Sequence, residues 1–285
     1  GYIDRASSDL KSMYFSSGYY GISSSLKAIV FAGHERTYQA WYGVPQRYLD
    51  SNRTFNPYNY ENEVDDYKQS HFQLHYNKRF NKNLSLDIAS HFTKGGGYYE
   101  QYIGEKQNSI LYNGDYIFGE NNLSFYGLED TIANLIRRKW LDNDFYGMTF
   151  NFKHKYNKAA NITLGGAANT YNGDHFGKVI FTEIHGDIDH EYYRNNAIKN
   201  DAVMYLKLNY ILTKNLFSYI DLQSRLIDYN FEGYDEYGNV SDQKINLKFF
   251  NPKYGIYYTL TEQSSLYASF AEGKKEPNRN DYVES

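Results

Sequence analysis

The sequence contains no cysteine, little proline and no long apolar run, and each absence excludes a class of structure. With 0 Cys and 4 Pro in 285 residues, it has neither a disulfide framework nor a thiolate metal site. The longest clear apolar run covers residues 28–32, whereas a membrane-spanning helix needs roughly 20 residues. The net charge of −4 comes without any basic run, so we expect no nucleic-acid partner.

Tyrosine is the residue type in greatest excess. The chain has 33 Tyr and 18 Phe, and aromatic residues make up 19% of it. Tyrosine favours β-strands, and its apolar ring with a polar tip suits half-wet interfaces. The mean hydropathy of −0.73 is typical of soluble proteins. A transmembrane β-barrel is equally polar, because only alternate strand residues face lipid and its loops are polar.

Alternation of apolar and polar residues predicts five β-hairpins. In the final strand, for example, Leu266, Ala268 and Phe270 fall on one face, while Tyr267 and Ser269 fall on the other. The predicted hairpins pair Leu10–Tyr20 with Leu26–Glu35, Tyr67–Phe80 with Leu84–Lys94, Asp144–Tyr156 with Ile162–Asn172, Ala202–Leu212 with Leu216–Asn230, and the two arms of Lys244–Lys274 across Thr261–Ser264.

The predicted connections alternate strictly between short turns and long polar loops. The long loops are Arg36–Asp66, Gly95–Asn143, Gly173–Asp201 and Phe231–Gln243. Compact soluble domains rarely contain several such loops, whereas outer-membrane barrels have short periplasmic turns and long outer loops. Predicted strands of about 11–15 residues are long enough to cross a bilayer at a tilt. The fold class is therefore all-β, an antiparallel transmembrane β-barrel fragment of about ten strands.

Paired tyrosines lie near several predicted strand ends and suggest aromatic girdles at the two membrane interfaces. The pairs are Tyr19–Tyr20, Tyr98–Tyr99, Tyr192–Tyr193 and Tyr257–Tyr258. A sheet that is simply rich in tyrosine is the alternative. With either explanation, the apolar strand face is assigned to lipid and the polar face to the lumen.

Three stretches resemble TonB-dependent outer-membrane receptors, most of all those of Bacteroidetes-type bacteria. They are GYIDRASSDLKS at Gly1–Ser12, GHERTYQAWYGVPQRYLDSNRTFNPY at Gly33–Tyr58 and SLYASFAEGKKEPNRNDY at Ser265–Tyr282. The resemblance implies a 22-stranded barrel plugged by an N-terminal globular domain. Residues 1–285 would then be a partial barrel domain, about the middle ten strands, without the plug. The lack of an initiator Met and of a signal segment agrees with an excerpt of a longer polypeptide.

The resemblance also implies function. Such receptors take up scarce nutrients across the Gram-negative outer membrane with energy delivered through TonB. The expected partners are the TonB complex, through the missing plug, a small-molecule metal chelate such as an iron–siderophore complex, and outer-membrane lipid. No resident cofactor is expected. Two alternatives stay open: a passive porin or structural barrel, and a soluble secreted glycan-binding or glycan-cleaving β-protein.

The ligand-binding candidates lie in the predicted outer loops and are Arg36, Tyr38, Trp41, Tyr42, His185 and Arg279. Aromatic rings next to guanidinium groups can bind an anionic, aromatic siderophore by stacking and charge-assisted hydrogen bonds. Anchoring in the outer girdle is the alternative for Trp41 and the tyrosines. Arg279 follows the last strand, near the outer mouth that the family resemblance implies, where a structural role is equally open.

Neither a metal site nor an active site is indicated. Glu183, His185, Asp187 and Asp189 alternate and would share one face of an extended segment, but their spacing matches no metal motif, which favours a solvated loop. The sequence has no G-x-S-x-G, H-E-x-x-H or Walker motif, so we expect no enzyme. An acidic pair for glycosidase chemistry stays open among the 34 acidic residues.

Overall fold

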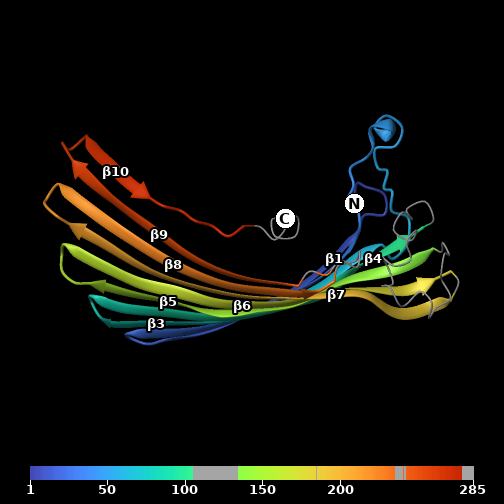
Figure 1. Cartoon of the computed structure of the whole chain (residues 1–285), viewed down its shortest axis with the longest axis horizontal. Helices are drawn as coiled ribbons and strands as arrows, with labels where there is room; N and C mark the ends of the chain where they lie inside the picture. Colours follow the sequence, from blue (N-terminus) through green and yellow to red (C-terminus); the bar gives the residue numbers. More distant parts are fainter. Residues whose placement is uncertain (105–133, 184, 235–239, 241, 278–285) are drawn as a thin grey trace.

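The chain forms one ten-stranded antiparallel sheet in which each strand pairs with its neighbours in the sequence (Figure 1). The computed structural model describes residues 1–104, 134–183, 185–234, 240 and 242–277. The strands are β1 (Ser8–Tyr20), β2 (Ser24–Tyr38), β3 (Val64–Asn81), β4 (Leu84–Ile103), β5 (Leu135–Lys155), β6 (Ala160–Thr182), β7 (Gly186–Ile211), β8 (Leu216–Gly233), β9 (Gln243–Thr259) and β10 (Ser265–Ala271), and a 3-10 turn, η1 (Gln46–Tyr48), lies between β2 and β3. No helix within the described residues is long and apolar enough to span a membrane.

All five predicted hairpins are confirmed, together with their short turns. Side chains in the turns explain why the chain reverses at these points. The Asn157 carboxamide oxygen accepts hydrogen bonds from the backbone N–H groups of Ala159 and Ala160, at 2.7 and 2.8 Å. Asn81 accepts one in the same way from the N–H of Asn83, at 2.8 Å. Asparagine favours turns because its side chain substitutes for a backbone partner in this manner.

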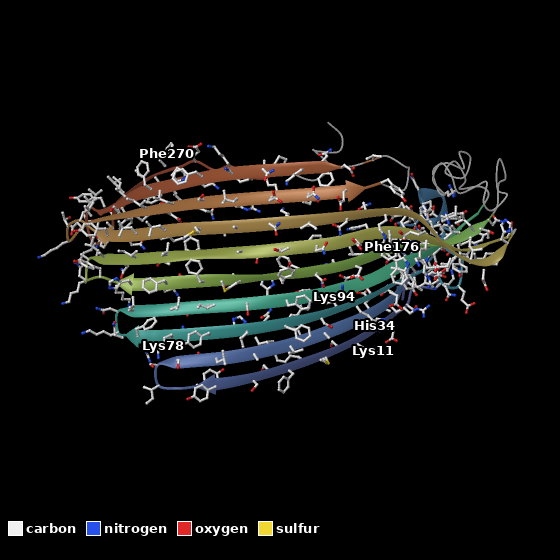
Figure 2. The ribbon with its side chains drawn as sticks, turned by 60° about the horizontal axis from the view of Figure 1, so that its bottom comes forward. Lys11, His34, Lys78, Lys94, Phe176 and Phe270 are labelled. Atoms are coloured by element: carbon white, nitrogen blue, oxygen red, sulfur yellow. The ribbon has the colours of Figure 1, made fainter. Side chains whose placement is uncertain are left out.

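The sheet is curved. Near the end where the five short hairpin turns lie, its convex face is largely apolar. On β5, Met148 and Phe150 project to this face, whereas Thr149 lies on the concave face between Ala89 of β4 and Ala167 of β6. Figure 2 looks onto the convex face, where Phe270 of β10 is also exposed. Met148 is 50% exposed. Such a wide exposed apolar face matches the lipid-facing surface that the sequence predicts.

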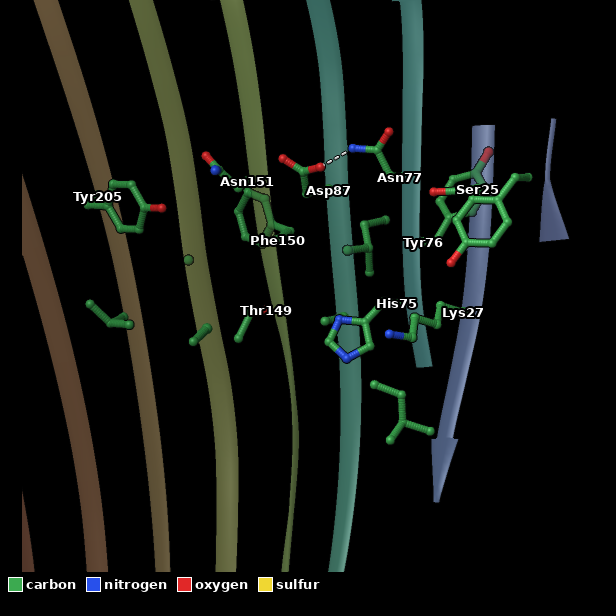
Figure 3. Close-up of a pocket in the computed structure, with 17 residues that line it drawn as sticks. Ser25, Lys27, His75, Tyr76, Asn77, Asp87, Thr149, Phe150, Asn151 and Tyr205 are labelled. Carbon is green, nitrogen blue, oxygen red and sulfur yellow. Dashed lines mark hydrogen bonds between the residues drawn. The ribbon is translucent and has the colours of Figure 1, made fainter. Parts of the chain in front are cut away.

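The concave face is polar at the same level. A cavity of about 550 Å³ extends along it from β1 to β7 (Figure 3). Its lining includes Lys27, His75, Asn77 and Asp87, and Asn77 donates a hydrogen bond to Asp87. The opposite characters of the two faces follow from the period of two residues in every strand.

The convex apolar residues cover only part of each long strand. On β7 they run from Ala202 to Tyr210, about 26 Å along the strand at about 3.3 Å per residue. At a tilt of about 40° this length covers about 20 Å of the membrane normal, most of an apolar band about 25 Å tall. The preceding residues of β7, 186–201, continue the ladder beyond that band.

The predicted loops Gly95–Asn143 and Gly173–Asp201 are therefore wrong in extent. Strand β4 continues to residue 103 and β5 begins at 135, while β6 and β7 leave only residues 183–185 between them. Alternation fails as a guide here because both sheet faces are polar beyond the apolar band. Cross-strand ion pairs replace apolar contacts, as between Lys94 and Asp142, at 2.5 Å, and between Arg194 and Asp174, at 2.9 Å.

The tyrosine pairs occupy two kinds of position. Tyr19–Tyr20 and Tyr257–Tyr258 lie at or near the turn ends of β1 and β9. Tyr98–Tyr99 and Tyr192–Tyr193 lie inside the long strands β4 and β7, and Tyr192 is only 3% exposed. The placement of these last two pairs near strand ends was wrong, because the strands continue past them.

Candidate ligand-binding site at the outer end of the sheet

The connection between β2 and β3, residues 39–63, is held against the sheet by buried amides. Gln39 is 0% exposed, and its side-chain nitrogen donates to the carbonyls of Val64 and Glu100, at 3.2 and 2.9 Å. Asn56 donates to the carbonyls of Asp4 and Gln39, both at 3.0 Å. Buried polar groups that find such partners fix a loop in one conformation. We call this connection the outer loop.

Arg5 adds a cationic clamp to the outer loop from the N-terminal segment. Its guanidinium donates to the carbonyl of Asn56 at 2.8 Å and to that of Tyr58 at 2.6 and 2.9 Å. These hydrogen bonds have a charged donor and are stronger than bonds between neutral groups. The segment before β1 and the outer loop thus form one packed unit.

This unit presents an aromatic cluster toward β4. Trp41, which is 51% exposed, lies edge-on to Tyr58 and to Tyr99 of β4, with ring centroids 6.1 and 5.2 Å apart. Tyr42 packs against Tyr58 at 5.6 Å. The ammonium of Lys139, on β5, lies 5.9 Å from the centroid of the Tyr99 ring. Edge-to-face rings with a nearby cation make a preorganised aromatic surface.

A cavity of about 510 Å³ lies next to this cluster. The Trp41 side chain also interacts with the carboxyl group of Asp65, a lining residue. The lining mixes carboxylates, a cation, an imidazole and phenols, and consists of Glu35, Asp65, Tyr67, Gly97, Tyr98, Tyr99, Lys139, Trp140, Leu141, His175 and Tyr193. A concave, partly aromatic site with a few convergent polar groups is typical of small-molecule binding.

The structure brings only part of the predicted set to this cavity. Trp41 and Tyr42 belong to the aromatic cluster beside it. Tyr38 is buried, and its hydroxyl donates to the carbonyl of Tyr60 at 2.8 Å, so it holds the outer loop. Arg36 donates to the side chain of Asn62 at 3.3 Å. Its register places it on the sheet face opposite the cavity-lining Glu35.

The remaining two candidates lie elsewhere. His185 belongs to the tight connection between β6 and β7, where its backbone N–H donates to the Thr182 hydroxyl at 3.1 Å. Arg279 lies outside the described residues. Within the described part of the chain, no group of three or more His, Asp or Glu residues is placed to hold a metal ion.

The sequence analysis did not identify most of the residues that line this cavity. Tyr99, Lys139, His175 and Tyr193 all lie in stretches expected to be loops. They come together because β4 to β7 extend beyond the apolar band and align these positions side by side. A signal for them exists in the sequence: polar and aromatic residues that alternate with a period of two within the stretches expected to be loops.

Burial raises the pKa of Tyr58, Tyr60 and Glu63 in the outer loop. Glu63 is 4% exposed, and burial raises its pKa to about 7, although the backbone N–H groups of Tyr60 and Asn59 and the charge of Arg5 oppose the rise. Burial, assisted by the Glu100 carboxylate, raises the pKa of Tyr60 to about 12. The Tyr60 hydroxyl accordingly stays protonated and donates to Glu100 at 2.8 Å.

Docking of the outer loop is expected to weaken as the pH rises. Because the folded pKa of Glu63, about 7, lies above its ordinary value of 4.5, the docked loop holds a proton that the detached loop releases. The stability of the docked state therefore falls between these two values and levels off above the higher one. Glu63→Gln should remove this dependence and keep the loop docked at alkaline pH.

Hydrogen exchange of the outer-loop amides, corrected for intrinsic rates, measures this effect at about pH 5 and about pH 8. The exposed acid Glu61 of the same loop provides a matched control, since Glu61→Gln should leave the pH dependence in place. Equal protection at both pH values in the native protein would contradict the role assigned to Glu63.

Comparison with known proteins places this geometry in a family. The family described as TonB dependent receptor-like, beta-barrel matches residues 12–284. No curated protein sequence matches the chain.

Three solved structures illustrate the likeness. The ferric-catecholate import receptor Fiu from E. coli K12, in its open form, has a TM-score of 0.65 at 12% identity, and the match covers 96% of this chain and 48% of that one. The ferric citrate transporter FecA has a TM-score of 0.65 at 11% identity, covering 94% and 36%. The copper transporter OprC has a TM-score of 0.63 at 8% identity, covering 96% and 38%.

At these identities the likeness concerns the fold, and the chain spans less than half the length of each of the three structures. The match to the family model, in contrast, runs along almost the whole chain. The chain therefore belongs to the TonB-dependent receptor family, as part of its β-barrel.

Proposed function

We propose that the complete receptor imports a small metal chelate, an iron–siderophore complex or a similar nutrient, across the outer membrane. The observation that carries the proposal is the cavity beside Trp41, which opens on the concave face at the end of the sheet away from the short turns. Stacking on Trp41 and Tyr99 suits an aromatic chelator, while Lys139 suits its negative charge.

The ligands named for the structural relatives support the same class of ligand. They include a ferric-catecholate receptor, a ferric citrate transporter and a copper transporter. A receptor from Bordetella pertussis with the same fold, at a TM-score of 0.55 and 13% identity, is described as an alcaligin outer-membrane receptor. Outer-membrane localisation, energy supply through TonB and a plug domain elsewhere in the polypeptide belong to the proposal. We also propose that the protein transports its ligand and does not catalyse a reaction on it.

Uptake by cells tests the proposal. The full-length receptor, expressed in a Gram-negative host that lacks its own chelate receptors, is offered ferric 2,3-dihydroxybenzoate, ferric citrate or copper(II) in labelled form. We expect uptake of at least one of them, abolished when the TonB gene of the host is deleted. No uptake of any, or uptake that persists without TonB, would overturn the proposed function. Persistent, TonB-independent flux would favour the porin alternative.

Trp41→Ala should weaken binding of the imported chelate about fivefold, because an exposed stacking contact contributes about 1 kcal/mol. Leu49→Ala is the matched control, since Leu49 is an exposed apolar residue of the same loop outside the cavity lining. Affinity is measured by quenching of intrinsic fluorescence in purified receptor. Equal affinities of the two variants would remove Trp41 from the ligand site.

A further inference from the structure

The chain leaves the wall of the sheet after β10 and runs over the concave face (Figure 1). The N–H of Glu272 still donates to the carbonyl of Pro252 in β9, at 3.0 Å. Beyond it, the side chain of Asn251 takes over the pairing: its oxygen accepts from the N–H of Lys274 at 2.8 Å and its nitrogen donates to the Lys274 carbonyl at 3.2 Å. We call residues 272–277 the inner segment.

The inner segment carries one carboxylate to two cations of the concave face. The ammonium of Lys199, on β7, lies 2.7 Å from both carboxylate oxygens of Glu276. The guanidinium of Arg225, on β8, lies 3.5 Å from one of them. The Glu276 side chain is 15% exposed. This carboxylate thus lies in a largely enclosed polar site on β7 and β8, although the segment that carries it follows β10.

The charges of this site balance only when Glu276 is present. Arg225 is already paired with Asp201, to which its Nε donates at 3.0 and 3.1 Å. Two cations and the single carboxylate of Asp201 leave one surplus positive charge on the wall, next to Lys199. The same ammonium lies 5.7 Å from the ring centroid of Tyr229. Without Glu276 the wall would present a carboxylate-binding group with an aromatic floor.

The position of Glu276 also allows a carboxylate from solution to replace it. Residues 272–275 are exposed, and hydrogen bonds to Pro252 and Asn251 hold this segment. The Lys199 and Glu276 side chains are 29% and 15% exposed, so water and small solutes reach the ion pair between them. A free carboxylate of the same geometry is therefore able to compete with Glu276 for Lys199 and Arg225.

We propose that Lys199 and Arg225 form an anion site on the lumen wall for carboxylate groups of the imported chelate. Glu276 is the built-in ligand of this site, which the chelate displaces on its way through the barrel. The assignment rests on the proposed import function, and it narrows the cargo to chelates that carry a carboxylate.

Binding of a simple dicarboxylate tests the site without transport. The purified full-length receptor is titrated with metal-free succinate at neutral pH, and binding is followed by ligand-observed NMR. Glu276→Gln should bind succinate about tenfold more tightly than the native receptor, because the resident carboxylate is gone. Adding Lys199→Gln to that variant should reverse the gain. Glu272→Gln, in the exposed part of the same segment, should match the native receptor.

Equal affinities of the native receptor and Glu276→Gln, or a gain that survives Lys199→Gln, would overturn the site. A gain in Glu272→Gln would also overturn it, since it would reflect loosening of the inner segment alone. Failure of the native receptor to import any chelate would instead contradict the proposed function. The titration needs no transport, so the two failures are distinguishable.

Discussion

Phe150→Arg is expected to lower the free energy of unfolding of the full receptor in lipid vesicles by about 2–4 kcal/mol, the cost of a cation at the bilayer midplane of a β-barrel. Phe150 lies midway along the convex apolar residues of β5 and beside Gly166 of β6. A Cβ atom at Gly166 would be 2.9 Å from the Phe150 ring. The aromatic ring therefore lies over the glycine, and the two-residue period of the strand puts it on the same face as Met148.

Thr149→Arg is the matched control for this prediction. Thr149 is the preceding residue of the same strand, but it lies on the concave face between Ala89 and Ala167. Its replacement should change the free energy of unfolding by less than about 1 kcal/mol, because the arginine meets water in the lumen. Denaturant titrations in vesicles compare the two variants. Equal losses would mean that the convex face is not the lipid face.

Gln39→Ala is expected to detach the outer loop. The substitution removes two hydrogen bonds and leaves the buried carbonyls of Val64 and Glu100 without the donor that now satisfies them. Each buried group left unsatisfied costs about 1–3 kcal/mol, so the free energy of loop opening should fall by about 3 kcal/mol. Hydrogen exchange of the loop amides should accelerate about 100-fold.

The consequence for function follows from Trp41, which the same loop carries to the cavity. Gln39→Ala should weaken chelate binding more than Trp41→Ala does, because Tyr42 and Tyr58 are displaced together with the tryptophan. Gln46→Ala, at an exposed position of the same loop, should leave both exchange and binding unchanged. Unaltered exchange in Gln39→Ala would show that the loop is held by other contacts.

The hairpins were predictable because their signals are local. Turn asparagines such as Asn81 and Asn157 act within three residues. Within the apolar band one face meets lipid and the other meets water, so the side-chain period of two is visible in the sequence itself. Beyond the band this contrast ends. The parts of β4 to β7 that lie within residues 95–143 and 173–201 were therefore predicted to be loops.

The candidate site was predictable only in part for the same reason. Trp41 and Tyr42 stand out as exposed aromatic residues in a loop. Tyr99, Lys139 and His175 acquire their meaning only through the alignment of β4, β5 and β6. The charge of Arg36 led us to predict a ligand contact, and only the register shows that it lies on the sheet face opposite the cavity-lining Glu35.

By itself the sequence determined the number of strands, their antiparallel order and the two faces of the wall. These features depend on short turns and on a two-residue period, both of which are written into neighbouring residues. Only the tertiary structure decided how far the strands extend, which polar residues share the outer cavity, and that Glu276 reaches Lys199 across two strands. Those features depend on register between distant residues, which no local pattern encodes.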